Sequence, residues 1–500
     1  MSYDIIIGLE IHTEVKTKSK MFCPCPNSSL FEAPNINVCP ICLGHPGTLP
    51  VPNQLAIEAC LLLGLAFNSQ INQISKFDRK NYFYPDLPKG YQISQYDLPL
   101  VHGGSLYLGS NRSIDITRIH LEEDTGKLSH NDHGSLVDFN RAGAPLIELV
   151  TEPTIASASE AKKFCQNYQR VLRYLKVSDA DMEKGQMRCE ANVSLQIPGT
   201  WRYVEGRIDP VDEAQLNAKV EVKNINSFKA LEKAINFEIE RQSELIKHKK
   251  HIDPETRGWN EDLAQTVAQR TKESSADYRY FPEPDIPPLV ISDQWLQAIK
   301  HKVVELPQTK QERFVTEYGF SENDAETLTT DSDLADFAEA VISELRAWIE
   351  ASGDDDDRQR IALVKASSGW LTTELFKHLK INDHSIGDIK FSAENLAHLI
   401  VLVYQDKINS SAAQIIFNQM YQIGGDPAHI MLDMNLEQNS NEDELETIIK
   451  QVLSEYPNQA QEFKSGKTAV MQFLVGKVMS QTNGKANPKL LPDIISKIIN

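Results

Sequence analysis

Residues 6–14 read Ile6-Ile7-Gly8-Leu9-Glu10-Ile11-His12-Thr13-Glu14, a stretch in which aliphatic and polar side chains alternate. This period of two predicts a β-strand with one apolar and one polar face. The apolar face carries Ile5, Ile7, Leu9 and Ile11, and the polar face carries Glu10, His12 and Glu14. Carboxylates together with an imidazole bind divalent cations, so the polar face is a candidate metal site. The simpler alternative is a strand face covered only by water.

A second predicted strand ends in three acids and reads Arg118-Ile119-His120-Leu121-Glu122-Glu123-Asp124. If it lies beside the first strand, its carboxylates add to the same site. Further acids that we place in strands are Glu148, Glu183 and Glu190. The candidates for neutralising a phosphate group are Arg79, Lys80, Arg141, Arg188, Lys223 and Arg279. Each of these cations alone is weak evidence, because a given Arg is more often a surface or ion-pair residue.

The usual nucleotide-binding motifs are missing from the sequence. Gly466-Lys467-Thr468 resembles the end of a P-loop, but Gln461 stands where the first glycine belongs. No G-x-G-x-x-G follows a predicted strand. If the protein uses ATP, we therefore expect carboxylate-held Mg²⁺ and basic side chains of a sheet to hold it.

Four of the seven cysteines form a separate motif, Cys23-Pro24-Cys25 followed by Cys39-Pro40-Ile41-Cys42. In a chain without export signals, this spacing favours a tetrahedral zinc site over disulfides, with reduced free thiols as the alternative. Four protein ligands leave no open position on the metal. We therefore expect a structural Zn²⁺.

Composition and charge indicate a globular, cytoplasmic protein with no membrane association. Of its 500 residues 41% are apolar and 24% are charged; the start lacks a signal peptide, and no apolar run is long enough for a membrane span. The net charge of −19 argues against a chain coated with nucleic acid. Residues 461–500 differ, because they carry six lysines and two acids.

Proline usage divides the chain into a strand-rich first part and a helical second part. Twenty of the 24 prolines lie at or before Pro307, and the proline-rich run 281–288 marks the end of the first domain. Helices are predicted from residue 54, around 161–175, from Ser227, and through much of 307–422. Strands are predicted at 136–150, 189–197 and 219–225. The fold class is α+β, with domains at 1–291, 292–423 and 424–500.

Several long motifs resemble the B subunit of the tRNA-dependent amidotransferase, the bacterial and organellar GatCAB enzyme. They are Gly8–His12, Lys76–Tyr96, His120–Lys127, Asp138–Arg141, Glu221–Phe228 and Asp277–Asp285. The resemblance covers essentially the whole chain. It implies a cradle domain similar to the glutamine synthetase catalytic fold, with the zinc-binding loop at 23–42, then a helical domain and a YqeY-like tail.

The resemblance also implies an activity, a ligase that amidates misacylated Glu-tRNA(Gln), Asp-tRNA(Asn) or both. In this family the B subunit uses ATP to phosphorylate the side-chain carboxylate, and ammonia from the glutaminase A subunit displaces phosphate. A small C subunit completes a heterotrimer. The zinc would only support the structure.

The resemblance also implies roles for individual residues of this chain. The catalytic Mg²⁺ is expected at Glu10, His12, Glu123 and Glu148, with Glu122 and Glu190 as further catalytic acids; Glu14 is a flanking residue. ATP is expected to contact Arg79, Lys80, Arg141, Arg188, Lys223 and Arg279. The tail lysines expected to bind tRNA are Lys464, Lys467, Lys477, Lys485 and Lys489.

Two other functions stay open on the sequence alone. The chain could be a tRNA-binding scaffold whose acids serve only the structure, or a ligase that acts by itself on a free metabolite. The second alternative does not explain the basic tail. We find no amidase-type Ser-Ser-Lys arrangement in the sequence, so the ammonia must come from another protein.

Overall fold

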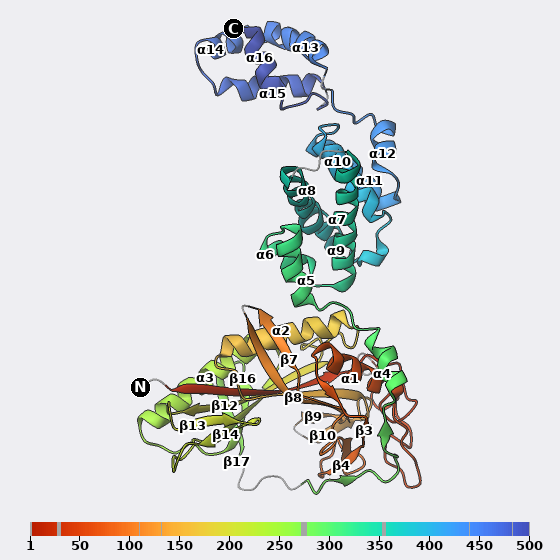
Figure 1. Cartoon of the computed structure of the whole chain (residues 1–500), viewed down its shortest axis with the longest axis vertical. Helices are drawn as coiled ribbons and strands as arrows, with labels where there is room; N and C mark the ends of the chain where they lie inside the picture. Colours follow the sequence, from red (N-terminus) through yellow and green to blue (C-terminus); the bar gives the residue numbers. More distant parts are fainter. Residues whose placement is uncertain are drawn as a thin grey trace. The chain divides into compact units, whose positions relative to one another are not determined.

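The structure is a computed structural model that describes residues 3–27, 32–109, 111–131, 133–271, 278–352, 357–439, 441–482 and 484–499 (Figure 1). The chain forms two compact units, Met1–Thr309 and Lys310–Asn500. The first contains the sheets and the second is helical, so the predicted α+β class is confirmed. The predicted division into three domains at 291 and 423 stays a prediction.

The centre of the first unit is a ten-stranded mixed sheet with the first strand of the chain in its middle. In sheet order its strands are β17 (Gln265–Thr271), β16 (Glu255–Asn260), β15 (Val220–Ile225), β12 (Met187–Gln196), β1 (Asp4–Glu14), β11 (Pro145–Thr151), β8 (Arg112–Glu123), β6 (Val101–His102) and β2 (Gln70–Ile71), and β7 (Ser105–Gly109) pairs with β8. Among the described strands of this sheet, only β15 and β16 pair in parallel. The predicted strand 136–150 is interrupted, since β10 (Gly134–Asp138) and β11 are separate strands.

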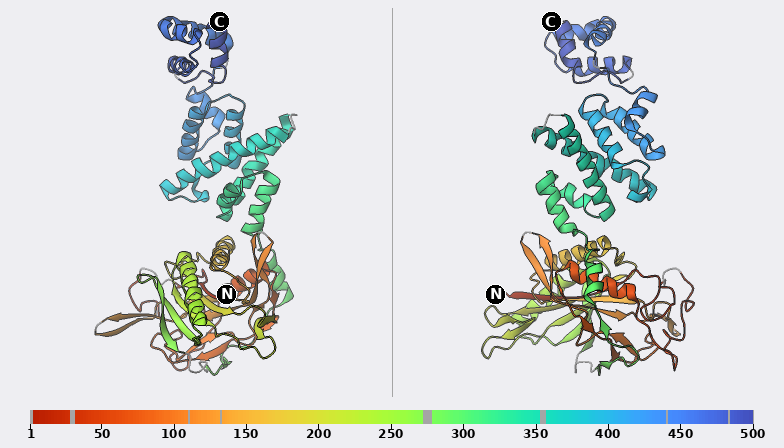
Figure 2. Two further views of the ribbon diagram at one scale, coloured as in Figure 1. Left: turned by 90° about the vertical axis from the view of Figure 1, so that its left-hand side faces the viewer. Right: turned by 45° about the vertical axis from the view of Figure 1, so that its right-hand side comes forward.

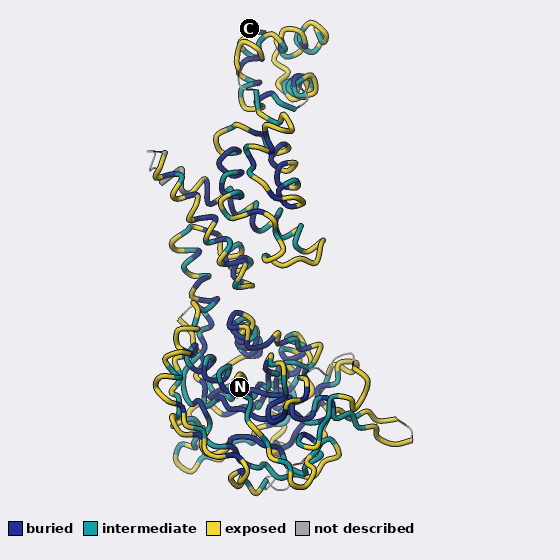
Figure 3. The backbone as a smooth tube through the Cα atoms, turned by 90° about the vertical axis from the view of Figure 1, so that its right-hand side faces the viewer, coloured by how far each residue is buried: buried dark blue, intermediate teal, exposed yellow. Residues whose placement is uncertain are grey.

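Three helices cover the apolar face of this sheet, α1 (Gln54–Ala66), α2 (Ala158–Tyr174) and α3 (Phe228–Lys247). Figures 1 and 2 show them on one side of the strands. Asn53, Ser157 and Ser227 each accept a hydrogen bond from the first turn of the helix that follows. Ile7, Leu9 and Ile11 of β1 are buried in the core that these helices share with the sheet, and buried backbone is concentrated there (Figure 3). The predicted faces of β1 are therefore confirmed.

Short strands complete the first unit. The end of the unit returns to its early part: β18 (Phe281–Pro282) pairs with β4 (Asp78–Asn81), which also pairs with β5 (Tyr91–Ser94), and β19 (Leu289–Val290) pairs with β3 (Ile74–Ser75). Two hairpins project from the unit, β9 (Lys127–Asn131) with β10 and β13 (Trp201–Val204) with β14 (Arg207–Pro210). Helix α4 (Asp293–Lys300) packs on α1.

The described part of the second unit contains helices and one isolated β-bridge. The longer helices are α5 (Pro307–Arg313), α6 (Glu322–Leu328), α7 (Ser332–Ser352), α8 (Asp357–Gly369), α9 (Phe376–Asn382), α10 (Ala393–Tyr404), α11 (Ser410–Ile423), α12 (Pro427–Asp433), α13 (Glu442–Glu455), α14 (Pro457–Lys464), α15 (Val470–Gln481) and α16 (Leu491–Ile499). The last four share a hydrophobic core. Among the described residues, no helix is both long and apolar enough to cross a membrane.

Candidate active site

The polar face of the sheet brings three side chains from three strands together, and we call them the first acid cluster. His12 lies on β1, Glu148 lies opposite it on β11, and Glu122 lies on β8. The Nε2 atom of His12 is 3.2 Å from a Glu122 oxygen and 3.4 Å from a Glu148 oxygen. Neighbouring ligands of an octahedral cation with 2.1 Å bonds are about 3.0 Å apart, so these three donors suit a small divalent cation.

Burial and mutual charge control the protonation of the first acid cluster. Burial alone would lower the pKa of His12, but the charges and hydrogen bonds of Glu148 and Glu122 outweigh it and raise the pKa well above its ordinary value. Burial would raise the pKa of Glu148, yet His120 and His12 hold it well below its usual range. The cluster therefore contains two carboxylates compensated by an imidazolium. A divalent cation could replace that proton as the compensating charge.

A second group of carboxylates lies on the same face of the sheet, around Glu10, which is two residues before His12 on β1. Glu10 lies opposite Glu190 of β12, and Glu221 of β15 completes the group, with one ligand oxygen from each within 4.8 Å of the others. Lys223 occupies the edge of this second acid cluster, 2.8 Å from Glu190 and 3.3 Å from Glu221. Asn192 donates to Glu10 at 3.0 Å. Glu10 and His12 thus belong to two neighbouring clusters of the same strand.

Glu123 does not join the residues with which it was predicted to bind Mg²⁺. Successive residues of a strand point to opposite faces, so Glu122 reaches the first acid cluster and Glu123 faces away from it. The Glu123 carboxylate instead forms a buried ion pair with Lys89 and accepts a hydrogen bond from the amide of Ile93 at 2.9 Å. It lines a cavity of about 190 Å³ that also borders Cys23 and Cys42.

The two predicted strands are also not neighbours, because β11 lies between β1 and β8. Only one acid of the Glu-Glu-Asp run reaches the first acid cluster, and it does so across β11. Glu183 is not on a strand; it is exposed in a turn before β12. Glu14 stays outside both acid clusters.

Lys80 is the predicted phosphate-binding cation that lies beside the first acid cluster and has no ion-pair partner among the described residues. Its ammonium lies 5.1 Å from the centre of the Tyr278 ring, and among the described residues no carboxylate is close enough to pair with it. Burial would lower the pKa of Lys80, but the charges of Glu122 and Glu148 raise it. Lys80 therefore remains a cation beside the cluster.

Arg79 has a different environment from its neighbour Lys80. Its guanidinium binds the buried carboxylate of Glu283 through two hydrogen bonds of 2.7 and 2.8 Å and lies 4.3 Å from the centre of the Tyr91 ring. These contacts join β4 to the segment that leaves the first unit. The structure thus shows Arg79 in a structural contact with Glu283, and its contact with ATP stays a prediction.

The remaining predicted cations have other partners, although Arg188 lies opposite His12 on β12. Arg188 and Arg141 both pair with the buried Asp124, at 2.8 and 3.3 Å, and Arg141 also donates to the carbonyls of Thr125 and Gly126. Arg279 is exposed, and its carbonyl accepts from Asn81. Lys223 belongs to the second acid cluster. The structure therefore brings Arg188 together with Lys80 and Lys223, and not the whole set of six, to the acid clusters.

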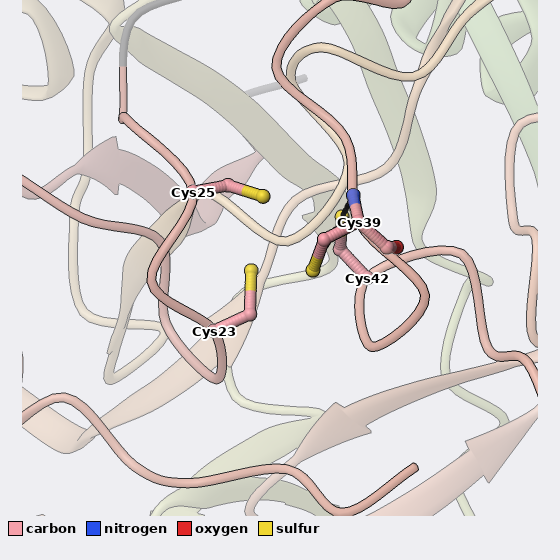
Figure 4. Close-up of side chains that lie close together, drawn as sticks. All are labelled: Cys23, Cys25, Cys39 and Cys42. Atoms are coloured by element: carbon pink, nitrogen blue, oxygen red, sulfur yellow. Dashed lines mark hydrogen bonds between the residues drawn. The ribbon is translucent and has the colours of Figure 1, made fainter.

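The four cysteines converge as their spacing predicted (Figure 4). Their four sulfur atoms all lie within 4.8 Å of one another, and the sulfurs of Cys39 and Cys42 are 3.9 Å apart. In a tetrahedral site with Zn–S bonds of 2.3 Å, two sulfurs are about 3.8 Å apart, so the four thiols fit zinc. A hydrogen bond from Cys23 lowers the pKa of Cys42 to about 4 against the effect of burial, while burial raises the pKa of Cys25 to about 11.

A buried lysine accompanies the cysteines. Lys20 is only 1% exposed, and its ammonium donates to the carbonyls of Asn37 at 2.7 Å and Phe139 at 3.4 Å and lies 3.8 Å from the sulfur of Cys42. A buried ammonium requires compensation by nearby negative groups. A zinc ion with four thiolates carries two net negative charges and would supply it.

The predicted tRNA-binding lysines are spread over the last helices. Lys464 ends α14, Lys467 lies in the following turn, Lys477 is on α15, and Lys485 and Lys489 precede α16. Lys467 and Lys489 form ion pairs of 3.4 and 2.6 Å with Glu462 and Asp406, whereas the ammonium of Lys477 lies over the rings of Tyr456 and Phe473. Three of the five lysines therefore already have partners within the second unit.

Sequence reasoning missed His120, which contacts the first acid cluster, and Glu221, a member of the second acid cluster. His120 lies opposite Glu148 on β8, with its Nε2 atom 3.2 Å from a Glu148 oxygen, and Glu221 belongs to the second acid cluster. Both could have been found from strand period alone. His120 precedes Glu122 by two residues, and Glu221 alternates with the buried Val220 and Val222.

Comparisons with known proteins give a consistent result over the whole length. The chain matches the family model described as GatB/GatE catalytic domain over residues 5–297, and the GatB domain model over residues 358–499. It is 42% identical over 501 residues to a protein of Thermoanaerobacter pseudethanolicus and 43% identical over 507 residues to one of Dehalococcoides mccartyi, each alignment covering 99% of both chains. A Thermotoga maritima protein is 41% identical over 508 residues, which span 100% of this chain and 99% of the relative. All three relatives are named as the B subunit of an aspartyl/glutamyl-tRNA(Asn/Gln) amidotransferase.

Proposed function

Because the chain belongs to the GatB family of amidotransferase B subunits, we propose that it amidates misacylated Glu-tRNA(Gln), Asp-tRNA(Asn) or both in an ATP-dependent reaction. The observation that carries the proposal for this chain is the pair of acid clusters on the polar face of β1, with Lys80 beside them. Such an arrangement can position and neutralise a transferring phosphoryl group, which is most of what phosphoryl transfer requires.

The proposed reaction has two steps. The side-chain carboxylate of the tRNA-bound Glu or Asp takes the γ-phosphoryl group of ATP and releases ADP, because a free carboxylate has no good leaving group. Ammonia then attacks the acyl phosphate, and phosphate leaves as the amide forms. We assign the supply of ammonia to a glutaminase A subunit and the completion of a heterotrimer to a small C subunit.

The residues of this chain take the following roles in the proposal. His12, Glu122 and Glu148 would hold a Mg²⁺ ion, which neutralises phosphate charge when bound; Glu10, Glu190 and Glu221 offer a second site for a cation. Lys80 would contribute positive charge toward the phosphates. Glu123, which was predicted as a metal ligand, has no part in this set because of its pairing with Lys89.

Two further sites complete the proposal. Cys23, Cys25, Cys39 and Cys42 would hold a structural Zn²⁺ that takes no part in the reaction, as the convergence of four sulfur ligands supports. Lys464, Lys467, Lys477, Lys485 and Lys489 would contact tRNA phosphates, and their scatter supports contacts along a backbone more than a single anion pocket.

The test replaces Glu148 by Gln in the complex purified with its partner subunits. We expect the ATP-dependent amidation of Glu-tRNA and Asp-tRNA to fall by about 100-fold or more, since the loss of an outer-shell partner alone reduces activity by about 10- to 100-fold. Glu183→Gln removes one exposed carboxylate and is the matched control. Unchanged amidation by Glu148→Gln would refute the catalytic role and favour the scaffold function.

A further inference from the structure

Four tyrosine rings form a continuous row on the small sheet of β4, β5 and β18. Tyr82 and Tyr280 each meet Tyr278 edge to face at 6.0 Å, and Tyr280 stacks on Tyr96 with ring centres 4.1 Å apart and an angle of only 7° between the planes. We call this set the tyrosine row. The near-parallel pair is at its outer end.

The inner part of the tyrosine row adjoins the first acid cluster. Lys80 lies over Tyr278, and the hydroxyl of Ser94, two residues before Tyr96, donates to Glu122 at 3.4 Å. Burial raises the pKa of Tyr280 to about 12, and the nearby charges of Lys80, Glu122 and Glu148 also act on it. The row therefore extends outward from the place where the proposed phosphoryl transfer occurs.

Tyr96, at the outer end of the tyrosine row, is exposed, and its backbone is held by the neighbouring residues. Tyr96 is 59% exposed although Tyr280 stacks on one face of its ring. The amide of Tyr96 donates to the buried Asp78 at 3.1 Å, and Lys76 bridges Asp78 and Asp97 at 2.8 and 2.7 Å. The ring of Tyr96 is thus held in place near the first acid cluster, with part of its apolar surface exposed to water.

We propose that the outer face of Tyr96 is a stacking platform for a purine base of a substrate, either the adenine of ATP or the 3′-terminal adenosine of the aminoacyl-tRNA. The inference rests on the proposed function, because both bases are then joined to groups that react at the first acid cluster. Bases stack on aromatic rings without regard to hydrogen-bond pattern, and a base on Tyr96 would extend the parallel Tyr280–Tyr96 pair by one layer. Another protein chain covering Tyr96 is the competing occupant.

The experiment uses the full chain and two fluorescent probes, 2-aminopurine riboside triphosphate and tRNA with 2-aminopurine as its 3′-terminal base. Stacking quenches 2-aminopurine, so the readout reports the base and not turnover. We expect Tyr96→Ala to abolish the quenching of one probe and to raise its Kd by about 5- to 150-fold. Tyr96→Phe should retain quenching, and Tyr96→Leu should lose it while keeping apolar volume.

The outcomes are separable. Loss with the triphosphate alone identifies the adenine of ATP, and loss with the tRNA alone identifies the terminal adenosine. Tyr203→Ala, on the β13–β14 hairpin, is the control for removal of an exposed tyrosine. If neither probe is quenched in a Tyr96-dependent manner, or if Tyr96→Ala changes only the association with other subunits, the platform is refuted. Tyr96-dependent quenching together with unchanged amidation by Glu148→Gln would instead refute the proposed function and leave the base site.

Discussion

Glu14, the last residue of β1, provides a quantitative test of the electrostatics around the site. It lies outside both acid clusters, and burial followed by the charge of Asp124 raises its pKa from 4.5 to about 7, against the lowering effect of Arg141 and Arg188. Its folded-state pKa lies above its unfolded value. The resulting stabilisation is therefore complete below pH 4.5 and is lost as the pH rises through 7.

The variant Glu14→Gln removes this titration. Each pKa step of one corresponds to about 1.4 kcal/mol. From the values 4.5 and 7, linkage gives a gain in the variant's unfolding free energy relative to the original chain of about 0.8 kcal/mol at pH 5 and about 3.3 kcal/mol at pH 8. The expected change between these pH values is thus about 2.5 kcal/mol, most of it before pH 7.

The measurement is urea unfolding of the full chain at pH 5, 6, 7 and 8, followed by hydrogen exchange in peptides that cover β1. These peptides report the first unit separately from the helical unit. Glu183→Gln makes the same change in net charge at an exposed position and is the control. A stability difference that is equal at pH 5 and pH 8, or that follows pH in the same way in the control, would refute the reasoning.

Three further predictions concern contacts described above. Lys20→Met should release the proposed zinc about 10-fold faster to a chelator, because the buried ammonium beside Cys42 is lost; an unchanged release rate in a colorimetric zinc assay would contradict it. Arg79→Met should lower the unfolding free energy by about 3–5 kcal/mol, since it leaves Glu283 buried without its partner, and the added change Glu283→Met should recover most of the loss in urea unfolding; a double variant no more stable than the single one would show otherwise. Asn53→Ala should reduce the unfolding free energy by about 1–2 kcal/mol, because α1 loses the side-chain cap on two amides; no change in urea midpoint would exclude this role of the cap.

Strand period allowed much of the sheet to be predicted from sequence. In β1 the alternation correctly separated the buried Ile7, Leu9 and Ile11 from Glu10 and His12, because a strand that packs helices on one side must place its polar residues on the other. The start of α1 was equally evident from Asn53, whose side chain caps the first turn.

The arrangement of strands could not be predicted in this way, and the errors at the site follow from it. Period two places Glu122 and Glu123 on opposite faces of the sheet, but the register between β8 and β11 decides which of them shares a face with Glu148. Sequence also could not show that residue 79 meets residue 283, a contact between parts of the chain about 200 residues apart. Arg79 therefore seemed as suitable for a phosphate as Lys80, although of these two only Lys80 lies beside the acids.

The return of β18 and β19 to β4 and β3 sets the order in which the site can be assembled during synthesis. A nascent chain that has not yet emerged beyond residue 280 contains every residue of both acid clusters, since these end at Glu221. It lacks β18, one of the two strands that pair with β4, and the buried carboxylate that fixes Arg79. Because such distant pairings form late in folding, incomplete chains leaving the ribosome contain the acids before the sheet of β18, β4 and β5 is complete. Premature termination therefore yields a protein that has the residues of both acid clusters but an incomplete sheet beside them.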